Sequence, residues 1–384
     1  MMKRFFLIVL TCIISTTILS AQKIKVIGVF QLIEKGKYSE SKDIIEEALD
    51  RKSTQKWMKT WYARGVLCQT AYKEGIEKNN QKLLELYPDQ LYVAYRSFEH
   101  VRFMDRRGRY NNRLPSKYVL LANDLIQLGE NHYHKKEFDK AFRAYDHANS
   151  IFNIKMLSAK VDTNLLYNCA LSAFKSKNWK SANEYLTELN DYKYSSNIPH
   201  LMYTIYMFKH DTVQAKSVLL DGIKRYDDHE NLVLLLVDLL YKSGDFEGAV
   251  NTLDLAIKND SMNYTYPYSK GMLYQKNEEY DKAIRTFNEA LNVPCDTLKI
   301  YIGIGDSYYN KGAEINAKAR TISNINRYKK EHKKSDKAFY LALEWYEKAY
   351  ELDSANKEIK SKLIQLYEIL DIKDKIILLE KEGE

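Results

Sequence analysis

Small, hydrophobic and polar residues recur along this chain at the spacing of helices that pack in pairs. In the clearest segment, Gly271 and Tyr274 lie three residues apart, and Ala283, Phe287 and Ala290 follow at steps of four and three. Residues three or four apart share one face of an α-helix. The small residues let two helices approach closely and the rings fill the space around the contact, so this segment is predicted to form a helical hairpin.

The same spacing returns along most of the chain. The alanine of the second helix recurs at intervals of 41, 33, 34 and 34 residues, at Ala141, Ala182, Ala215, Ala249 and Ala283. Before each second helix stands an acidic or amide residue that favours a helix start, namely Glu137, Asn178, Asp211, Asp245 and Glu279. An aromatic residue follows in four of these five places and is predicted to wedge the turn: Phe138, Trp179, Phe246 and Tyr280.

This order of small, aromatic and small residues, at an interval near 34, resembles the tetratricopeptide repeat (TPR). A TPR is a helix-turn-helix unit that stacks on its neighbours because it cannot bury its apolar face alone. The resemblance implies an all-α fold, an α-solenoid of about eight TPR-like hairpins with two insertions. A C-terminal capping helix with a charged outer face is expected to shield the last core from water.

Irregularities in the spacing divide the chain into predicted segments. An insertion near 73–90 is polar and contains Pro88, so we expect it to project from the stack as a loop with a short helical piece. The full order is a signal peptide (1–21), N-terminal TPR-like repeats (22–104), a linker (105–116), the regular array (117–311), a basic helical-hairpin insertion (312–337), and the last repeat with the cap (338–384).

The amino end has the pattern of a secretory signal peptide. Lys3 and Arg4 precede an apolar run, and Leu19-Ser20-Ala21 forms a small-residue cleavage site. The run is too short for a membrane span. Lipid attachment at Cys12 is the alternative, disfavoured because Thr11 stands where a lipoprotein signal usually has Gly, Ala or Ser. The chain is therefore predicted to be exported, as a periplasmic protein or one associated with the cell envelope.

No motif for catalysis, metal binding or a cofactor emerges. Gly303 and Gly305 lack the preceding strand and the third glycine of a dinucleotide site. His132 and His134 lie two apart and point to different sides of a helix. After cleavage, the cysteines that remain are Cys68, Cys169 and Cys295, interpreted mainly as small buried apolar residues. We therefore predict a protein without enzymatic activity, cofactor or metal.

The formal net charge is +8, and two basic clusters, at 102–117 and 318–337, stand out. Solvated surface is the preferred interpretation. The alternatives are peripheral contact with an anionic membrane, an anionic glycan or an acidic partner. Nucleic acid is not predicted as a partner, because neither cluster interleaves the aromatic residues of a strand-stacking surface.

The resemblance also implies which side chains face the hollow of the stack, at the second, fifth, ninth, twelfth and thirteenth places of each repeat. Amides at the second place and rings at the fifth and twelfth would suit an extended peptide, because amides pair with its backbone and rings cover its side chains. The candidate peptide-binding groove is Asn123, Tyr133, Asn164, Tyr167, Phe174, Asn197, Asn231, Tyr241, Tyr268 and Tyr309. The alternative is that the amides mark helix starts and the tyrosines pack on neighbouring repeats.

The predicted function is a non-enzymatic adaptor that binds a peptide segment or a protein partner in its concave groove. The Lys or Arg with Asn that grips a free carboxyl terminus in some TPR proteins is missing from the fifth and ninth places, as at Leu234 and Asp238. Two other functions stay open: a structural platform that self-associates within an envelope complex, and a surface accessory protein for glycan binding or nutrient uptake.

Overall fold

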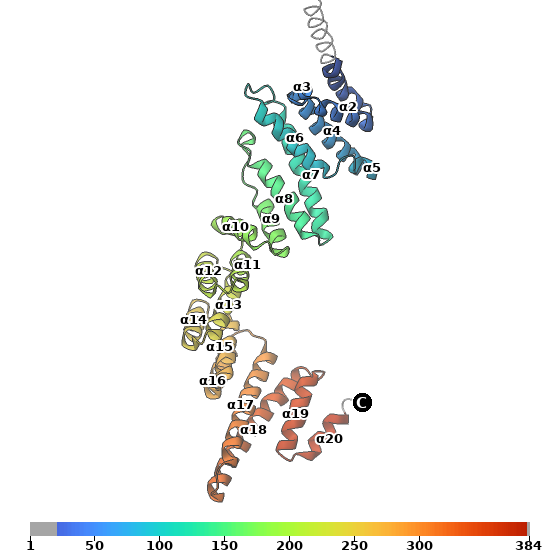
Figure 1. Cartoon of the computed structure of the whole chain (residues 1–384). Helices are drawn as coiled ribbons and strands as arrows, with labels where there is room; N and C mark the ends of the chain where they lie inside the picture. Colours follow the sequence, from blue (N-terminus) through green and yellow to red (C-terminus); the bar gives the residue numbers. More distant parts are fainter. Residues whose placement is uncertain (1–20, 382–384) are drawn as a thin grey trace, which may run out of the picture. The chain divides into compact units, whose positions relative to one another are not determined.

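The computed structural model describes residues 21–381, and within this range the chain consists of helices and their connections, without a strand (Figure 1). Contacts divide the chain into two compact units, Met1–Ile205 and Tyr206–Glu384, and each is described by itself. The predicted signal peptide lies outside the described residues except for Ala21, and Cys12 lies outside them altogether.

The first unit opens with a helix described from residue 21 to 34. The elements that follow are α2 (Tyr38–Asp50), α3 (Lys52–Gln55), α4 (Met58–Glu77), α5 (Gln81–Leu84), α6 (Gln90–Met104), α7 (Leu114–His134), α8 (Phe138–Phe152), the 3-10 turn η1 (Lys155–Leu157), α9 (Thr163–Lys175) and α10 (Trp179–Asp191). Hairpins form between α4 and α6, α7 and α8, and α9 and α10. Helix α11 (Asn197–Phe208) runs across the boundary between the units.

The second unit continues with α12 (Thr212–Arg225), α13 (Glu230–Lys242), α14 (Phe246–Asn259), α15 (Thr265–Lys276), α16 (Tyr280–Ala290), α17 (Thr297–Arg320), α18 (Ile325–Leu352), α19 (Lys357–Ile369) and α20 (Lys373–Lys381). Its hairpins are α13 with α14, α15 with α16 and α17 with α18, and α19 packs on α18 and α20. Contacts in each unit run mainly between helices that follow one another. The predicted all-α solenoid of helical hairpins is therefore confirmed.

Four hairpins close where a glycine of the first helix meets an aromatic ring of the second. A Cβ atom built on four of the glycines would lie no more than 3.1 Å from a carbon of the facing ring. The pairs are Gly65 with Phe98, Gly129 with Tyr145, Gly271 with Phe287, and Gly305 with Tyr346. Two other hairpins carry Ala170 with Leu186, and Val237 with Leu253, 16 residues apart, as are Gly129 and Tyr145 and also Gly271 and Phe287. A larger residue on the first helix thus goes with a smaller one on the second, which keeps the core close-packed.

Among the residues predicted to start second helices, those with short side chains cap the helix and those with long side chains do not. Asn178, Asp211 and Asp245 each accept a hydrogen bond from a backbone N–H three residues further on, at 3.4, 3.0 and 2.9 Å. Glu137 and Glu279 make no such bond. The longer side chains pair with neighbouring lysines instead. Hydrogen bonds with His132 and then Lys140 lower the pKa of Glu137, and a hydrogen bond with Lys282 is the largest cause that lowers the pKa of Glu279.

The insertion near 73–90 does not project from the stack, so that prediction was wrong. Helix α4 continues to Glu77, and after the expected short helical piece, α5, the chain folds back on the first unit. Leu86 and Tyr87 are buried. The Tyr87 hydroxyl donates to Glu46 at 2.7 Å, and the Lys42 ammonium donates to the Leu86 carbonyl at 2.7 Å. These two hydrogen bonds and the buried side chains fix the segment after α5 against α2.

Helices α17 and α18 both run through the segment 312–337. The two helices are in contact at Gly312. The Gly312 carbonyl accepts a hydrogen bond from the Ser335 hydroxyl at 2.8 Å, and the Gly312 Cα faces the ring of Phe339. From 320 to 334 no residue is buried. Despite the length of these helices, none in the described range is long and apolar enough to cross a membrane.

The predicted linker at 105–116 lies inside the first unit, where Tyr110 is buried and its ring packs 5.0 Å from that of Tyr62. The predicted domain boundaries stay a prediction. Cys68 and Cys169 are buried, as interpreted from the sequence, and burial raises the pKa of both thiols, that of Cys68 to about 12. Cys295 is only partly buried.

Candidate functional site

Nine of the ten residues predicted to line a groove lie on first helices of hairpins, and the tenth, Asn197, lies on α11. Helix α7 carries Asn123 and Tyr133, α9 carries Asn164, Tyr167 and Phe174, α11 carries Asn197, α13 carries Asn231 and Tyr241, α15 carries Tyr268, and α17 carries Tyr309. The four asparagines are exposed and the six aromatic residues are half-buried. The contacts of these side chains show which of them pack within the fold and which one lines a cleft.

Three of the aromatic residues pack against the second helix of their own hairpin. The ring of Tyr133 lies 5.3 Å from Phe138, and that of Phe174 lies 5.4 Å from Trp179, both edge to face. The ring of Tyr309 lies 5.6 Å from Phe339 in the same way. Edge-to-face rings stabilise one another beyond the area they bury. In the first two hairpins these contacts wedge the turn, as expected of Phe138 and Trp179.

Asn164 and Tyr167 are covered by a residue from the next connection. Tyr194 precedes α11, and its hydroxyl donates to the Asn164 side chain at 2.9 Å. Its ring stacks on Tyr167 with centroids 5.2 Å apart and planes at 26°. This contact could not be predicted from the repeat pattern, because Tyr194 lies outside the repeating positions. A ligand at these two residues would have to displace Tyr194.

Tyr268 also contributes to the core of its own hairpin. Its ring lies 5.7 Å from that of Phe287, a fully buried side chain. Burial raises the pKa of the Tyr268 hydroxyl. This residue therefore fixes α15 on α16 more than it offers a free surface.

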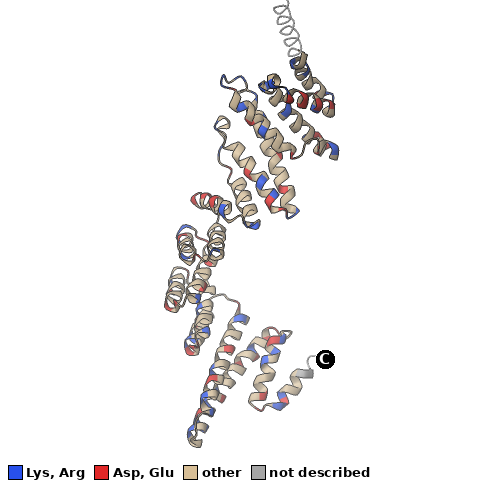
Figure 2. Cartoon of the chain, viewed as in Figure 1, with Lys and Arg blue, Asp and Glu red and all other residues tan. Residues whose placement is uncertain are grey.

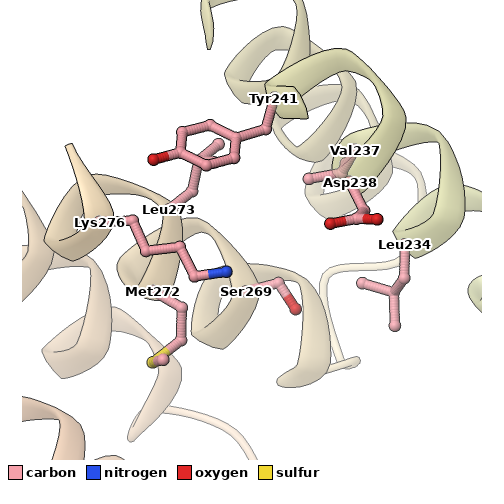
Figure 3. Close-up of a pocket in the computed structure, with 8 residues that line it drawn as sticks. All are labelled: Leu234, Val237, Asp238, Tyr241, Ser269, Met272, Leu273 and Lys276. Atoms are coloured by element: carbon pink, nitrogen blue, oxygen red, sulfur yellow. The ribbon is translucent and has the colours of Figure 1, made fainter. Parts of the chain in front are cut away.

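A cleft of about 240 Å³ opens between α13 and α15 in the second unit (Figure 3). Its lining consists of Leu234, Val237, Asp238 and Tyr241 from α13, and Ser269, Met272, Leu273 and Lys276 from α15. Tyr241 is the one residue of the predicted groove that lines it. Five of the eight occupy the fifth, ninth, twelfth or thirteenth places of their repeats: Leu234, Asp238, Tyr241, Met272 and Lys276. The resemblance assigns all of these places to the hollow, but of the five residues only Tyr241 was predicted as part of the groove.

The cleft has an apolar floor and charged edges. Leu273 and Val237 are buried, while Leu234 and Met272 are half-buried. In Figure 3 the Lys276 ammonium extends from α15 into the opening, and the Asp238 carboxylate faces it from α13. The ammonium lies 5.8 Å from the centroid of the Tyr241 ring, and Asp238 pairs with Lys242 at 2.7 Å. The site therefore offers an apolar surface, a ring, one donor cation and one acceptor anion.

The described residues contain no group of three or more His, Cys, Asp or Glu side chains that could hold a metal ion. Gly303 and Gly305, the pair weighed as a nucleotide motif, lie inside α17 and face the rings of Phe287 and Tyr346. Both glycines are explained by packing.

Comparison with known proteins agrees with the spacing. A family model for the tetratricopeptide repeat matches residues 268–293, which span most of α15 and α16. The matched hairpin is the one in which Gly271 faces Phe287. The chain is a tetratricopeptide-repeat protein. Three other hairpins of this TPR protein, α4–α6, α7–α8 and α17–α18, also pair a glycine of the first helix with an aromatic ring of the second.

Solved structures of TPR proteins are similar to this chain. One from Bacteroides fragilis is 21% identical, with a TM-score of 0.35, over 65% of this chain and 98% of that one. One from Cytophaga hutchinsonii is 15% identical, with a TM-score of 0.45, over 65% and 88%. YrrB, described as a TPR protein with an unusual peptide-binding site, is 14% identical, with a TM-score of 0.32, over 48% and 88%. No curated protein matches the chain.

Proposed function

We propose that this TPR protein is a non-enzymatic adaptor that holds an extended peptide segment of a partner protein in the cleft between α13 and α15. The observation that carries the proposal is the composition of that cleft: an apolar floor between a carboxylate on one helix and an ammonium on the other. An extended peptide presents the complementary set, because apolar side chains alternate along it with backbone donors and acceptors.

The floor accounts for most of the binding free energy. An apolar side chain of the partner would leave water for the surface formed by Leu234, Val237, Met272 and Leu273, and burial of a Leu-sized side chain contributes about 1.5–3 kcal/mol. The Tyr241 ring closes one side of this surface. Met272 is unbranched and adapts to different side chains, which suits a site that accepts related sequences.

The polar edges orient the peptide backbone. Asp238 accepts hydrogen bonds from backbone N–H groups, while Lys276 and the Ser269 hydroxyl donate to carbonyl groups. Only one cation and one anion face the opening, so salt should weaken binding modestly. A strongly charged partner segment is disfavoured for the same reason.

We further propose that the chain acts after export, at the cell envelope. Lys3, Arg4, the apolar run and Leu19-Ser20-Ala21 support this proposal. The mass of the protein isolated from cells tests it. Cleavage after Ala21 leaves an amino terminus at Gln22, whereas lipid attachment leaves a modified Cys12.

The binding proposal is tested by selection from a displayed library of random peptides on the mature chain. Selected peptides are expected to share an apolar residue and to lose at least about 30-fold in affinity for Tyr241→Ala, since buried aromatic anchors are typical hot spots. Tyr340→Ala, which removes an exposed tyrosine of α18, is the matched control and should leave affinity unchanged. Failure to select any peptide, or equal affinity for Tyr241→Ala, would refute the proposal.

A further inference from the structure

The far end of the α17–α18 hairpin concentrates the positive charge of the chain. Between Lys318 and Lys337, eight lysines and arginines stand against Glu331 and Asp336, a net charge of +6, where the whole sequence has +8. Figure 2 shows Lys and Arg gathered along this end of the hairpin, beyond the part where α19 packs on α18. The cleft between α13 and α15 does not involve it.

The lysines of α18 form a stripe along one side of the helix. Residues 329, 333 and 337 are four apart, as are 330 and 334, and the two rows are neighbours along one side of the helix. The opposite face is fixed toward α17, because Ser335 donates to the Gly312 carbonyl and Phe339 packs on the same residue. All five lysines are exposed. The stripe therefore points to solvent as a direct consequence of how the hairpin closes.

Most of these cations have no internal counter-charge. In the described part of the chain, six of the eight lie farther than 4.0 Å from any carboxylate oxygen: Arg320, Arg327, Lys329, Lys330, Lys333 and Lys337. Lys318 and Lys334 pair with Glu314 and Glu331 of their own helices. Six unpaired cations at one end repel one another and favour an anionic surface large enough to face all of them.

The turn between the helices adds exposed apolar side chains. Ile325 is 61% exposed, and Ile322 is partly exposed. Arg320 and Arg327 flank them on the two helices. Isoleucine beside cations is the combination that enters a lipid interface, where the apolar side chain lies among the headgroups and the charges contact phosphates.

We propose that the end of this hairpin, residues 318–337, docks on an anionic lipid membrane surface. A single-stranded nucleic acid would also meet the charge, but its bases bind by stacking on rings, and the two rings of the segment, Tyr328 and His332, pack against each other with centroids 5.5 Å apart. Exposed isoleucines contribute nothing to phosphate contacts. The hairpin would hold the TPR protein at a membrane while the cleft between α13 and α15 engages its partner.

Vesicle binding tests this proposal directly. The mature chain is expected to sediment with vesicles of phosphatidylcholine and phosphatidylglycerol, and not with phosphatidylcholine alone. Replacing Lys329, Lys330, Lys333 and Lys337 with glutamine should weaken binding about 100- to 1,000-fold, since each lysine near an anionic surface contributes a factor of about five. Ile325→Ser should weaken it about 10-fold through the lost apolar contact.

The matched control replaces four other exposed lysines of the second unit with glutamine: Lys209, Lys216, Lys224 and Lys258. It removes the same charge and should keep vesicle binding within about threefold, because these residues lie outside the hairpin. Circular dichroism verifies that each variant is folded. Equal losses in the two quadruple variants, absence of vesicle binding, or stripe-dependent binding to single-stranded RNA in place of vesicles would each overturn the proposal. Peptide binding to the cleft is expected to be unchanged in every variant.

Discussion

The two insertions of this chain occupy the same place in a hairpin and take opposite courses. Each lies between the first and second helix, in α4–α6 and in α17–α18, and both hairpins close with a glycine against a ring. The first insertion folds back and buries Leu86 and Tyr87, whereas the second lengthens both helices and buries nothing from 320 to 334.

Local sequence explains the difference. In the first insertion Asn79 and Asp89 adopt positive φ angles of 49° and 54°, and Pro88 stands just before the second of them. These residues break the helix on both sides of α5 and turn the chain back. The second insertion has no such residue after Gly312, and its lysines cannot be buried without partners. An inserted segment thus joins the core only where it carries apolar side chains that neighbouring helices can bury.

The largest expected effect comes from removing the anchor of the first insertion. Tyr87→Ala deletes a ring that is 5% exposed and a hydroxyl bonded to Glu46, and should lower the free energy of unfolding by about 3–5 kcal/mol. Tyr328→Ala, in the second insertion, should lower it by less than about 1 kcal/mol. Urea unfolding followed by circular dichroism measures both. Similar losses would show that the insertions do not differ in their coupling to the core.

A smaller effect on stability is expected at Asp124 of α7. The charge of Lys73, at the start of the first insertion, acts on the Asp124 carboxyl. Burial is the largest cause that raises the pKa of this carboxyl to about 6, and a hydrogen bond from Gln69 and the charge of Lys73 offset it in part. In the unfolded chain the pKa is about 3.9. Between these values the folded state binds more protons, so the free energy of unfolding falls as pH rises from about 4 to 6.

Asp124→Asn removes this cost of ionisation. The free energy of unfolding should rise by about 1 kcal/mol at pH 7, after allowance for partial exposure, and change little at pH 4. Unfolding curves at the two pH values measure the difference. A loss of stability at pH 7 would mean that the carboxylate is solvated and that the first insertion leaves this side of α7 open to water.

The packing of single hairpins could be predicted because it depends on residues close in sequence. The step of 16 residues from Gly271 to Phe287 fixes both the helix faces and their contact, and the same step separates Gly129 from Tyr145. The course of the first insertion could not be predicted in this way. Its polar composition favoured an exposed loop, although Leu86 and Tyr87 are buried. Their contacts are with α2, about 40 residues earlier in the sequence.

The candidate site was predicted only in part. Tyr241 was chosen for its ring and does line the cleft, but Asp238, Met272 and Lys276 enter it because α13 and α15 lie side by side at a particular offset. Repeat positions name these side chains without saying which of them share a cleft. Tyr194, which covers Tyr167, comes from a connection outside the repeat and left no periodic signal.

Hydrogen exchange of the unmodified chain tests most directly whether burial by neighbouring helices determines local stability. Amides protected by burial exchange only when the surrounding structure opens. The account predicts that peptides covering 320–334 exchange at least about 100-fold faster than peptides covering 84–98, although both ranges contain helix. Equal protection in the two ranges would contradict it.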